Sequence, residues 1–111
     1  MDRAIWGSSK LVWSLILANL IEGSVVSISD AGDLVTDIGE DQLNGAPRDT
    51  SVTVSFGPHE TNGIFTADHG EPDSTLIAIV GASGFLEIGI VGLSIHDMLQ
   101  VGVGEKISVK W

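Results

Sequence analysis

GASGFLEIGI, at residues 81–90, is the stretch that decides the fold, because its glycines bracket a short polar elbow and then lead into an apolar run. Another apolar run, TLIAIV at residues 75–80, comes directly before the elbow. Dense apolar runs separated by a short glycine-containing connection are typical of buried strands that pair as a hairpin. We therefore expect a β-hairpin over residues 75–91, covered on both faces, with backbone NH groups exposed at the elbow.

A second stretch, GSVVSISDAGDLVTDI at residues 23–38, repeats this design, with two β-branched runs around a turn that carries Gly32 between aspartates. Polar and apolar residues alternate at residues 51–56 and 106–111, which predicts strands with one buried face. A short helix is expected at residues 95–99, since Ser94 can cap it by accepting from the NH of Asp97. The sequence therefore predicts an all-β fold, a small barrel-like or Greek-key domain with one short helix near the C-terminus.

Composition limits the classes of partner. The 111 residues are sufficient for one domain, and 15 acidic against 5 basic residues give a formal charge of -10. This charge repels phosphate backbones and anionic membrane surfaces, so we expect neither nucleic acid nor a membrane as partner.

Cysteine is absent, which excludes thiolate chemistry. The apolar run at residues 11–21 is too short to span a bilayer and lacks a cleavage signal, so a cytoplasmic protein is expected. We interpret residues 1–20 as a helix or strand packed on the core of a β domain at 21–111.

The two stretches together resemble the C-terminal domain of the S-adenosylmethionine hydroxide adenosyltransferases, relatives of the fluorinating and chlorinating enzymes. The first family motif reads roughly Gly-x-Val-x-x-Ile-Asp-x-Phe-Gly-Asn-Leu-x-Thr-Asn-Ile, and the second Gly-Ser-Ser-Gly-x-Leu-Glu-Ile-Ala. The similarity runs from Gly23 to Trp111. It implies a barrel-like β module in which the corners at Gly32 and Gly84 face one shared hollow that takes an adenosyl ligand.

The resemblance also implies which residues meet S-adenosylmethionine or adenosine. Ser29, Ala31 and Asp33 stand where the first motif has its acidic residue, its aromatic residue and its first asparagine, and Ala82 replaces a serine of the second motif. Gly92 stands where the backbone meets the adenine. The expected ligand-binding residues are Ser29, Ala31, Asp33, Ala82, Ser83, Gly84 and Gly92.

These exchanges predict altered adenosyl binding. An asparagine amide offers a donor and an acceptor to the N7 and N6 edge of adenine, whereas ionised Asp33 only accepts, which leaves an unpaired contact costing about 1–3 kcal/mol. Ala31 removes an aromatic platform, and stacking on such a ring is worth about 1–3 kcal/mol. Ser29 removes the charged partner of the ligand's ammonium group.

The family's reaction is attack of water or halide on the ribose C5′, and it uses residues of an N-terminal α/β half. The resemblance therefore implies a module that is inactive alone and carries no resident cofactor. It also implies a partner, because the family's ligand lies between this module and the N-terminal domain of a neighbouring subunit in a trimer. A homo-oligomer, or an α/β domain acting in trans, would complete such a site. Two alternatives stay open, namely a structural or interaction domain with a decayed pocket and a fragment of a larger enzyme.

Other polar groups give weaker indications. The acidic residues between positions 30 and 41 lack the spacing of a calcium loop, so a solvated turn is favoured. His59 and the pair Asp68 and His69 are expected in exposed loops, and a metal or general-base site would require those loops to converge. We expect no metal and no catalytic residue. Glu87 is expected to accept hydrogen bonds from the NH groups of the elbow.

Overall fold

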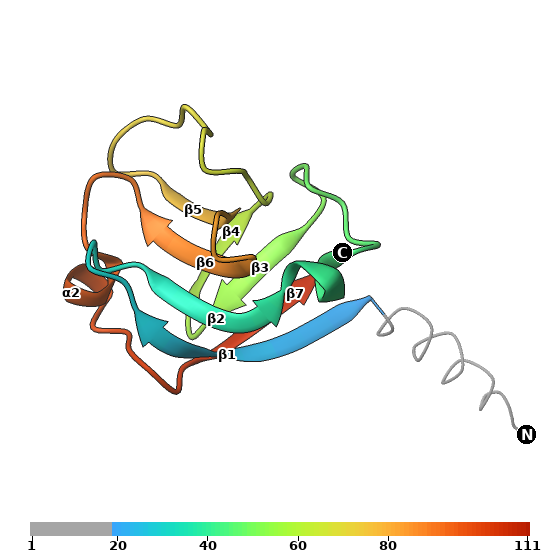
Figure 1. Ribbon diagram of the computed structural model, residues 1–111, viewed down its shortest axis with the longest axis horizontal. Coiled ribbons are helices and arrows are strands. Elements are labelled where there is room, and N and C mark those ends of the chain that lie inside the picture. Colours follow the sequence, from blue (N-terminus) through green and yellow to red (C-terminus); the bar gives the residue numbers. More distant parts are fainter. Residues whose placement is uncertain (1–18) are drawn as a thin grey trace, which may run out of the picture.

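The computed structural model describes residues 19–111, and their strands form one antiparallel, nearly closed barrel-like sheet in the order β4, β3, β7, β1, β2, β6, β5 (Figure 1). The all-β prediction is confirmed. The elements are β1 (Leu20–Ile28), β2 (Leu34–Gly39), the 3-10 helix η1 (Glu40–Leu43), β3 (Thr53–Phe56), β4 (His59–Asn62), β5 (Leu76–Val80), β6 (Phe85–Ile90), α2 (Ile95–Leu99) and β7 (Lys106–Lys110).

The N-terminal prediction falls mainly on residues 1–18, which lie outside the described residues. Leu20 already belongs to β1, where it pairs with Lys110. The β domain therefore begins at least one residue earlier than the predicted boundary at residue 21.

The core fills the inside of the barrel, as the alternating sequence pattern predicts. Val54 and Phe56 of β3 and Ile107 and Val109 of β7 are all at most 1% exposed, while the residues between them face outward. Each such side chain contributes about 1.5–3 kcal/mol through burial. The edge strands β4 and β5 approach each other, since the Thr61 hydroxyl donates to the carbonyl of Leu76 over 2.8 Å.

The predicted hairpins are present. Strands β1 and β2 pair in an antiparallel register that brings Ile28 opposite Leu34, and β5 pairs with β6 along the whole length of β5. The β2–β6 pairing contains an irregularity between Val35 and Gly39. The buried hydroxyl of Thr36 compensates there, because it donates to the Leu86 carbonyl over 2.7 Å and accepts from the NH of Ile38 over 3.2 Å.

Helix α2 begins as the sequence predicts. The Ser94 hydroxyl accepts from the NH of Asp97 over 3.2 Å, and the helix ends at Gln100 in a left-handed conformation. The NH of His96 donates to the carbonyl of Gly32 over 3.1 Å, so α2 is fastened to the β1–β2 turn. Figure 1 shows α2 and this turn on the left of the barrel, with η1 on the right. Neither of the helices in residues 19–111 has the length and hydrophobicity needed to cross a membrane.

Two sequence expectations about the strands are wrong. His59, which was expected in a loop, belongs to strand β4, because pairing with β3 supplies the hydrogen bonds that the polar sequence HETN does not predict. Strand β6 alternates between buried and more exposed residues, so only one of its faces belongs to the core.

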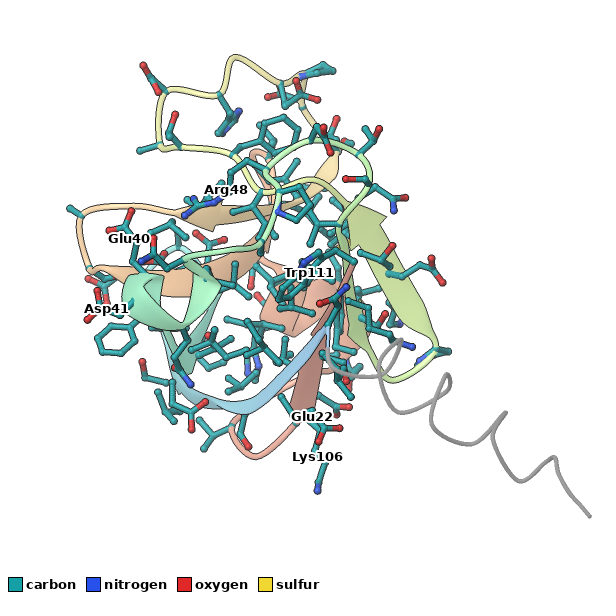
Figure 2. All side chains as sticks on the ribbon, turned by 90° about the vertical axis from the view of Figure 1, so that its right-hand side faces the viewer. Glu22, Glu40, Asp41, Arg48, Lys106 and Trp111 are labelled. Atoms are coloured by element: carbon teal, nitrogen blue, oxygen red, sulfur yellow. The ribbon has the colours of Figure 1, made fainter. Side chains whose placement is uncertain are left out.

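Figure 2 views the end of the barrel that carries Trp111, with Glu40 and Asp41 projecting from η1 beside it.

Candidate ligand-binding cavity

A cavity of about 440 Å³ lies on the outer face of β5 and β6, beside the β1–β2 turn. Its volume is within the range of small-molecule sites. Ile77 and Ile79 of β5 give it an apolar wall, and Ile77 is only 5% exposed although it lies outside the main core. The segment after β6, including Gly92 and Ser94, contributes to the lining.

The absence of a side chain at Gly89 makes room for the carboxyl group of Asp33, which lines the cavity. A Cβ atom at Gly89 would overlap Oδ1 of Asp33, so the carboxyl group of Asp33 lies directly over a residue that has no side chain. The backbone of Asp33 is fixed by the turn, because its NH donates to the Ser29 hydroxyl over 3.0 Å and its carbonyl accepts from the NH of Ser29 over 2.9 Å. Strand pairing therefore holds this carboxyl group against β6.

The cavity is acidic. Burial, and secondly the neighbouring charge of Glu87, raise the pKa of Asp33 above its ordinary value. Glu87 lines the same cavity, and its Oε2 accepts from the hydroxyl of Ser83 over 2.6 Å. His69 also lines the cavity, and its Nδ1 accepts from the NH of Glu71 over 2.8 Å. No lysine or arginine of the described chain lines the cavity.

Three predicted ligand residues, Ala31, Asp33 and Gly92, meet at this cavity. They come from the β1–β2 turn and from the segment after β6, which strand pairing brings together. Ser29 does not line it, because its hydroxyl is engaged with the NH of Asp33 inside the turn. The expectation that Ser29 faces the ligand is not met in this arrangement.

The elbow residues Ala82, Ser83 and Gly84 lie elsewhere. In the β2–β6 pair Leu34 stands opposite Ile88, and Gly39 stands opposite Phe85, so the turns at Gly32 and Gly84 are at opposite ends of the same pair of strands. The prediction of one hollow shared by both corners is therefore wrong. The physical reason is the antiparallel register, which places the start of β2 beside the end of β6.

Two of the NH groups at the elbow are already hydrogen-bonded within it. The NH of Gly84 donates to the carbonyl of Gly81 over 3.1 Å, and the NH of Phe85 donates to the Ser83 hydroxyl over 3.2 Å. Glu87 accepts from the side chain of Ser83, so the expectation that it accepts from elbow NH groups is corrected. Ser83 thus acts on the cavity indirectly, by fixing one carboxylate oxygen of Glu87.

The lining residues that sequence reasoning did not assign to a ligand site include Ile77, Ile79, Glu87 and His69. An acidic residue inside the apolar run of β6 was a usable signal for Glu87. His69 had none, because only the fold brings its loop to the sheet. In residues 19–111 no group of three or more histidine and acidic side chains is arranged to hold a metal ion. His59 packs on Phe56 in the β3–β4 hairpin, with ring centroids 5.3 Å apart.

The nearly closed sheet defines a small all-β, barrel-like class of domain, and comparison with known proteins extends this only at the level of the fold. No protein-family model matches the sequence, and no curated protein does. The chain is similar to the crystal structure of an uncharacterized conserved protein from Thermotoga maritima, with a TM-score of 0.70 and 23% identity over 84% of this chain and 36% of that one.

A second similar structure is that of a conserved hypothetical protein from Thermus thermophilus, with a TM-score of 0.62 and 22% identity. The match covers 79% of this chain and 34% of the other. At this level of identity the likeness establishes a shared fold. The chain spans about a third of the length of both similar structures.

Proposed function

We propose that this domain is an adenosyl-binding module similar to the C-terminal domain of the S-adenosylmethionine hydroxide adenosyltransferases, without catalytic activity of its own. The observation that carries the proposal is the convergence of Ala31, Asp33 and Gly92 on one cavity of about 440 Å³. These are three of the positions to which the family resemblance assigns the ligand.

The lining of the cavity suits both the flat apolar ring and the polar edge of a purine base. Ile77 and Ile79 offer apolar surface to a flat base, while Asp33 offers acceptor oxygens to an exocyclic amino group. Asp33 in place of an asparagine lacks the donor for the neighbouring ring nitrogen, which argues for weak binding by the natural sequence.

Calorimetric titration of the full chain with adenosine tests the proposal. We expect weak binding, and we expect Asp33→Asn to bind about tenfold more tightly because the amide supplies the missing donor. Ala31→Phe should give a similar gain by stacking. Asp37→Asn is the matched control, because Asp37 is exposed outside the cavity and accepts from the NH of Ser24, which an amide oxygen can also do.

Gly89→Ala is the variant that should lose binding in the same titration. Its Cβ would displace the carboxyl group of Asp33 into the cavity, so adenosine binding should be lost while the domain stays folded. Binding that is unaffected by Gly89→Ala, or no binding by the wild type and both gain variants, contradicts the proposal.

The proposed site is completed by a second polypeptide, either another copy in a trimer or an α/β domain in trans. Apolar side chains exposed on and around α2 favour such an assembly: Leu93, which lines the cavity, is 41% exposed, Met98 58% and Val103 66%. The proposal includes a cytoplasmic location, which cell fractionation tests. Light scattering of the purified chain, alone and with adenosine, tests the assembly; a monomer at all concentrations contradicts self-association.

A further inference from the structure

The carboxyl group of Asp33 differs from other carboxylates of the domain in its surroundings. Oε2 of Glu87 accepts from the Ser83 hydroxyl over 2.6 Å, and Oδ1 of Asp37 accepts from the NH of Ser24 over 2.9 Å. Within the described part of the chain no NH or OH group donates to the carboxyl oxygens of Asp33, although this group is partly buried and lines the cavity. A polar group that is partly removed from water and lacks a protein partner is one that a ligand in the cavity can satisfy.

The position of this carboxyl group favours its neutral form. It lies over Gly89, where a Cβ atom would overlap Oδ1, and the apolar side chains of Ile77 and Ile79 line the same cavity. Burial first, and then the negative charge of Glu87, raise the pKa of Asp33, so it takes up a proton at a higher pH than an exposed aspartate does. On protonation this group changes from accepting hydrogen bonds only to both donating and accepting them.

From these observations we propose that the cavity recognises its ligand through the neutral, protonated form of Asp33, so that acidification strengthens ligand binding. A protonated carboxyl group has a hydroxyl that donates and a carbonyl that accepts, as an asparagine amide has a donor and an acceptor. It therefore pairs with a ligand edge that carries an acceptor beside a donor, such as N7 and the N6 amino group of adenine, or a primary amide. The inference rests on the proposed function only for the choice of adenosine as one of its probes.

Other titratable groups lie on the elements around Asp33 and respond to the same change of pH. In residues 19–111 these groups are, by element, Glu87 of β6, His69 and Asp73 of the loop before β5, Asp30 of the β1–β2 turn, and His96 and Asp97 of α2. A histidine changes its charge between about pH 5 and pH 8. His69 lines the cavity, so its contribution has to be separated from that of Asp33 by substitution.

Calorimetric titration of the full chain with adenosine, over a series from about pH 7 to about pH 4, tests the proposal. We expect the wild-type affinity to rise about tenfold over this range, the gain expected from one added hydrogen bond. Asp33→Asn carries the donor at every pH, so its affinity should be about tenfold higher than that of the wild type at neutral pH and should converge with it in acid. Protonation of adenosine itself affects both proteins alike and cancels in their ratio. Circular dichroism at each pH restricts the comparison to folded protein, and a ratio that does not change with pH overturns the inference.

Three further variants assign the titration to Asp33. Asp37→Asn is the matched control, because it makes the same chemical change at an exposed carboxylate outside the cavity and should keep the pH dependence. His69→Gln should keep it as well, and a loss of the pH dependence in this variant would overturn the inference. Glu87→Gln removes the neighbouring negative charge, so the rise in affinity should move to a lower pH. A rise that stays at the same pH in Glu87→Gln would assign the titration to another group and would overturn the inference too.

A probe without the adenosyl group separates the two proposals. Benzamide has a flat ring and a primary amide and stays uncharged through this pH range, and nuclear magnetic resonance follows the backbone amides of Gly89 and Glu87 during its titration. We expect its affinity to rise on acidification in the wild type and to stay constant in Asp33→Asn. If benzamide behaves in this way and adenosine binds at no pH, the proposed function fails and the inference stands. If adenosine binds with no dependence on pH, the inference fails and the proposed function stands; binding of neither probe at any pH overturns the inference.

Discussion

The turns at Gly32 and Gly84 share a sequence design and differ in their surroundings. Both glycines have positive φ, 89° and 78°. A Cβ atom at Gly32 would overlap the Ser94 hydroxyl and lie 2.8 Å from the Ser94 Cα, whereas a Cβ atom at Gly84 would meet nothing within 4 Å. A glycine in a turn therefore indicates the backbone conformation, while the neighbours that surround it come from the register of distant strands.

The largest effect is expected from breaking the first turn. Gly32→Ala adds an unfavourable left-handed conformation to an overlap with Ser94, and should lower the free energy of unfolding by about 2–5 kcal/mol. Gly84→Ala has the conformational cost alone, about 1–2 kcal/mol. Urea denaturation of both variants measures the difference. Equal losses would mean that the packing of α2 on the β1–β2 turn contributes little.

The barrel interior and the elbow each contain a hydroxyl group that forms hydrogen bonds with backbone groups outside the regular strand pairing. These hydroxyl groups belong to Thr36 and Ser83 respectively. Thr36→Val leaves the NH of Ile38 and the carbonyl of Leu86 without their buried partner, so we expect a loss of about 1–3 kcal/mol. Thermal denaturation followed by circular dichroism measures this loss. A variant as stable as the wild type would show that the strands re-pair without the hydroxyl.

The free energy of unfolding should depend on pH through Asp33, which lies at the cavity end of the β2–β6 pair and not at the elbow. A raised pKa means that the native state holds the proton of Asp33 more tightly than the unfolded chain does. Its contribution is therefore favourable below the ordinary aspartate value of 3.8 and is lost as the pH rises through the raised pKa. Asp33→Asn removes this loss, so the variant should gain stability relative to the wild type between acid and neutral pH.

Urea denaturation of the wild type and Asp33→Asn at a series of pH values gives the difference directly. The carboxyl groups of Asp49 and Asp68, whose pKa values are lowered by hydrogen bonds from Ser51 and Thr66 respectively, are present in both proteins and cancel. A difference that stays constant or shrinks as the pH rises would contradict the assignment of Asp33 as a partly buried, charge-coupled group.

The smallest effect is expected at the elbow. Ser83→Ala removes the hydrogen bond to Glu87 at an exposed position, where the partner can bond to water instead, and should cost at most about 1 kcal/mol. Chemical denaturation measures this cost. A loss as large as that of Thr36→Val would mean that the elbow is a structural element of the barrel and not a support for Glu87.

Local signals in the sequence predicted several elements well. The cap at Ser94 predicted α2 at the observed residues, and the glycine-bounded apolar runs predicted both hairpins. Strand β4 was missed because HETN has no apolar residue that marks a buried face, and its existence depends on pairing with β3. Of the predicted ligand residues, Ala31, Asp33 and Gly92 line one cavity, whereas the elbow residues that were predicted with them do not.

The sequence by itself determined the periodicity of the strands, the positions of the turns and the acidic character of the chain, because these depend on neighbouring residues and on composition. Only the tertiary structure decided which turns lie together, that His69 and Glu87 share a cavity with Asp33, and that the hydroxyl of Ser29 is used inside its own turn. The physical reason is register: hydrogen bonding between strands distant in sequence sets which end of β6 lies beside β2, and no local pattern encodes that pairing.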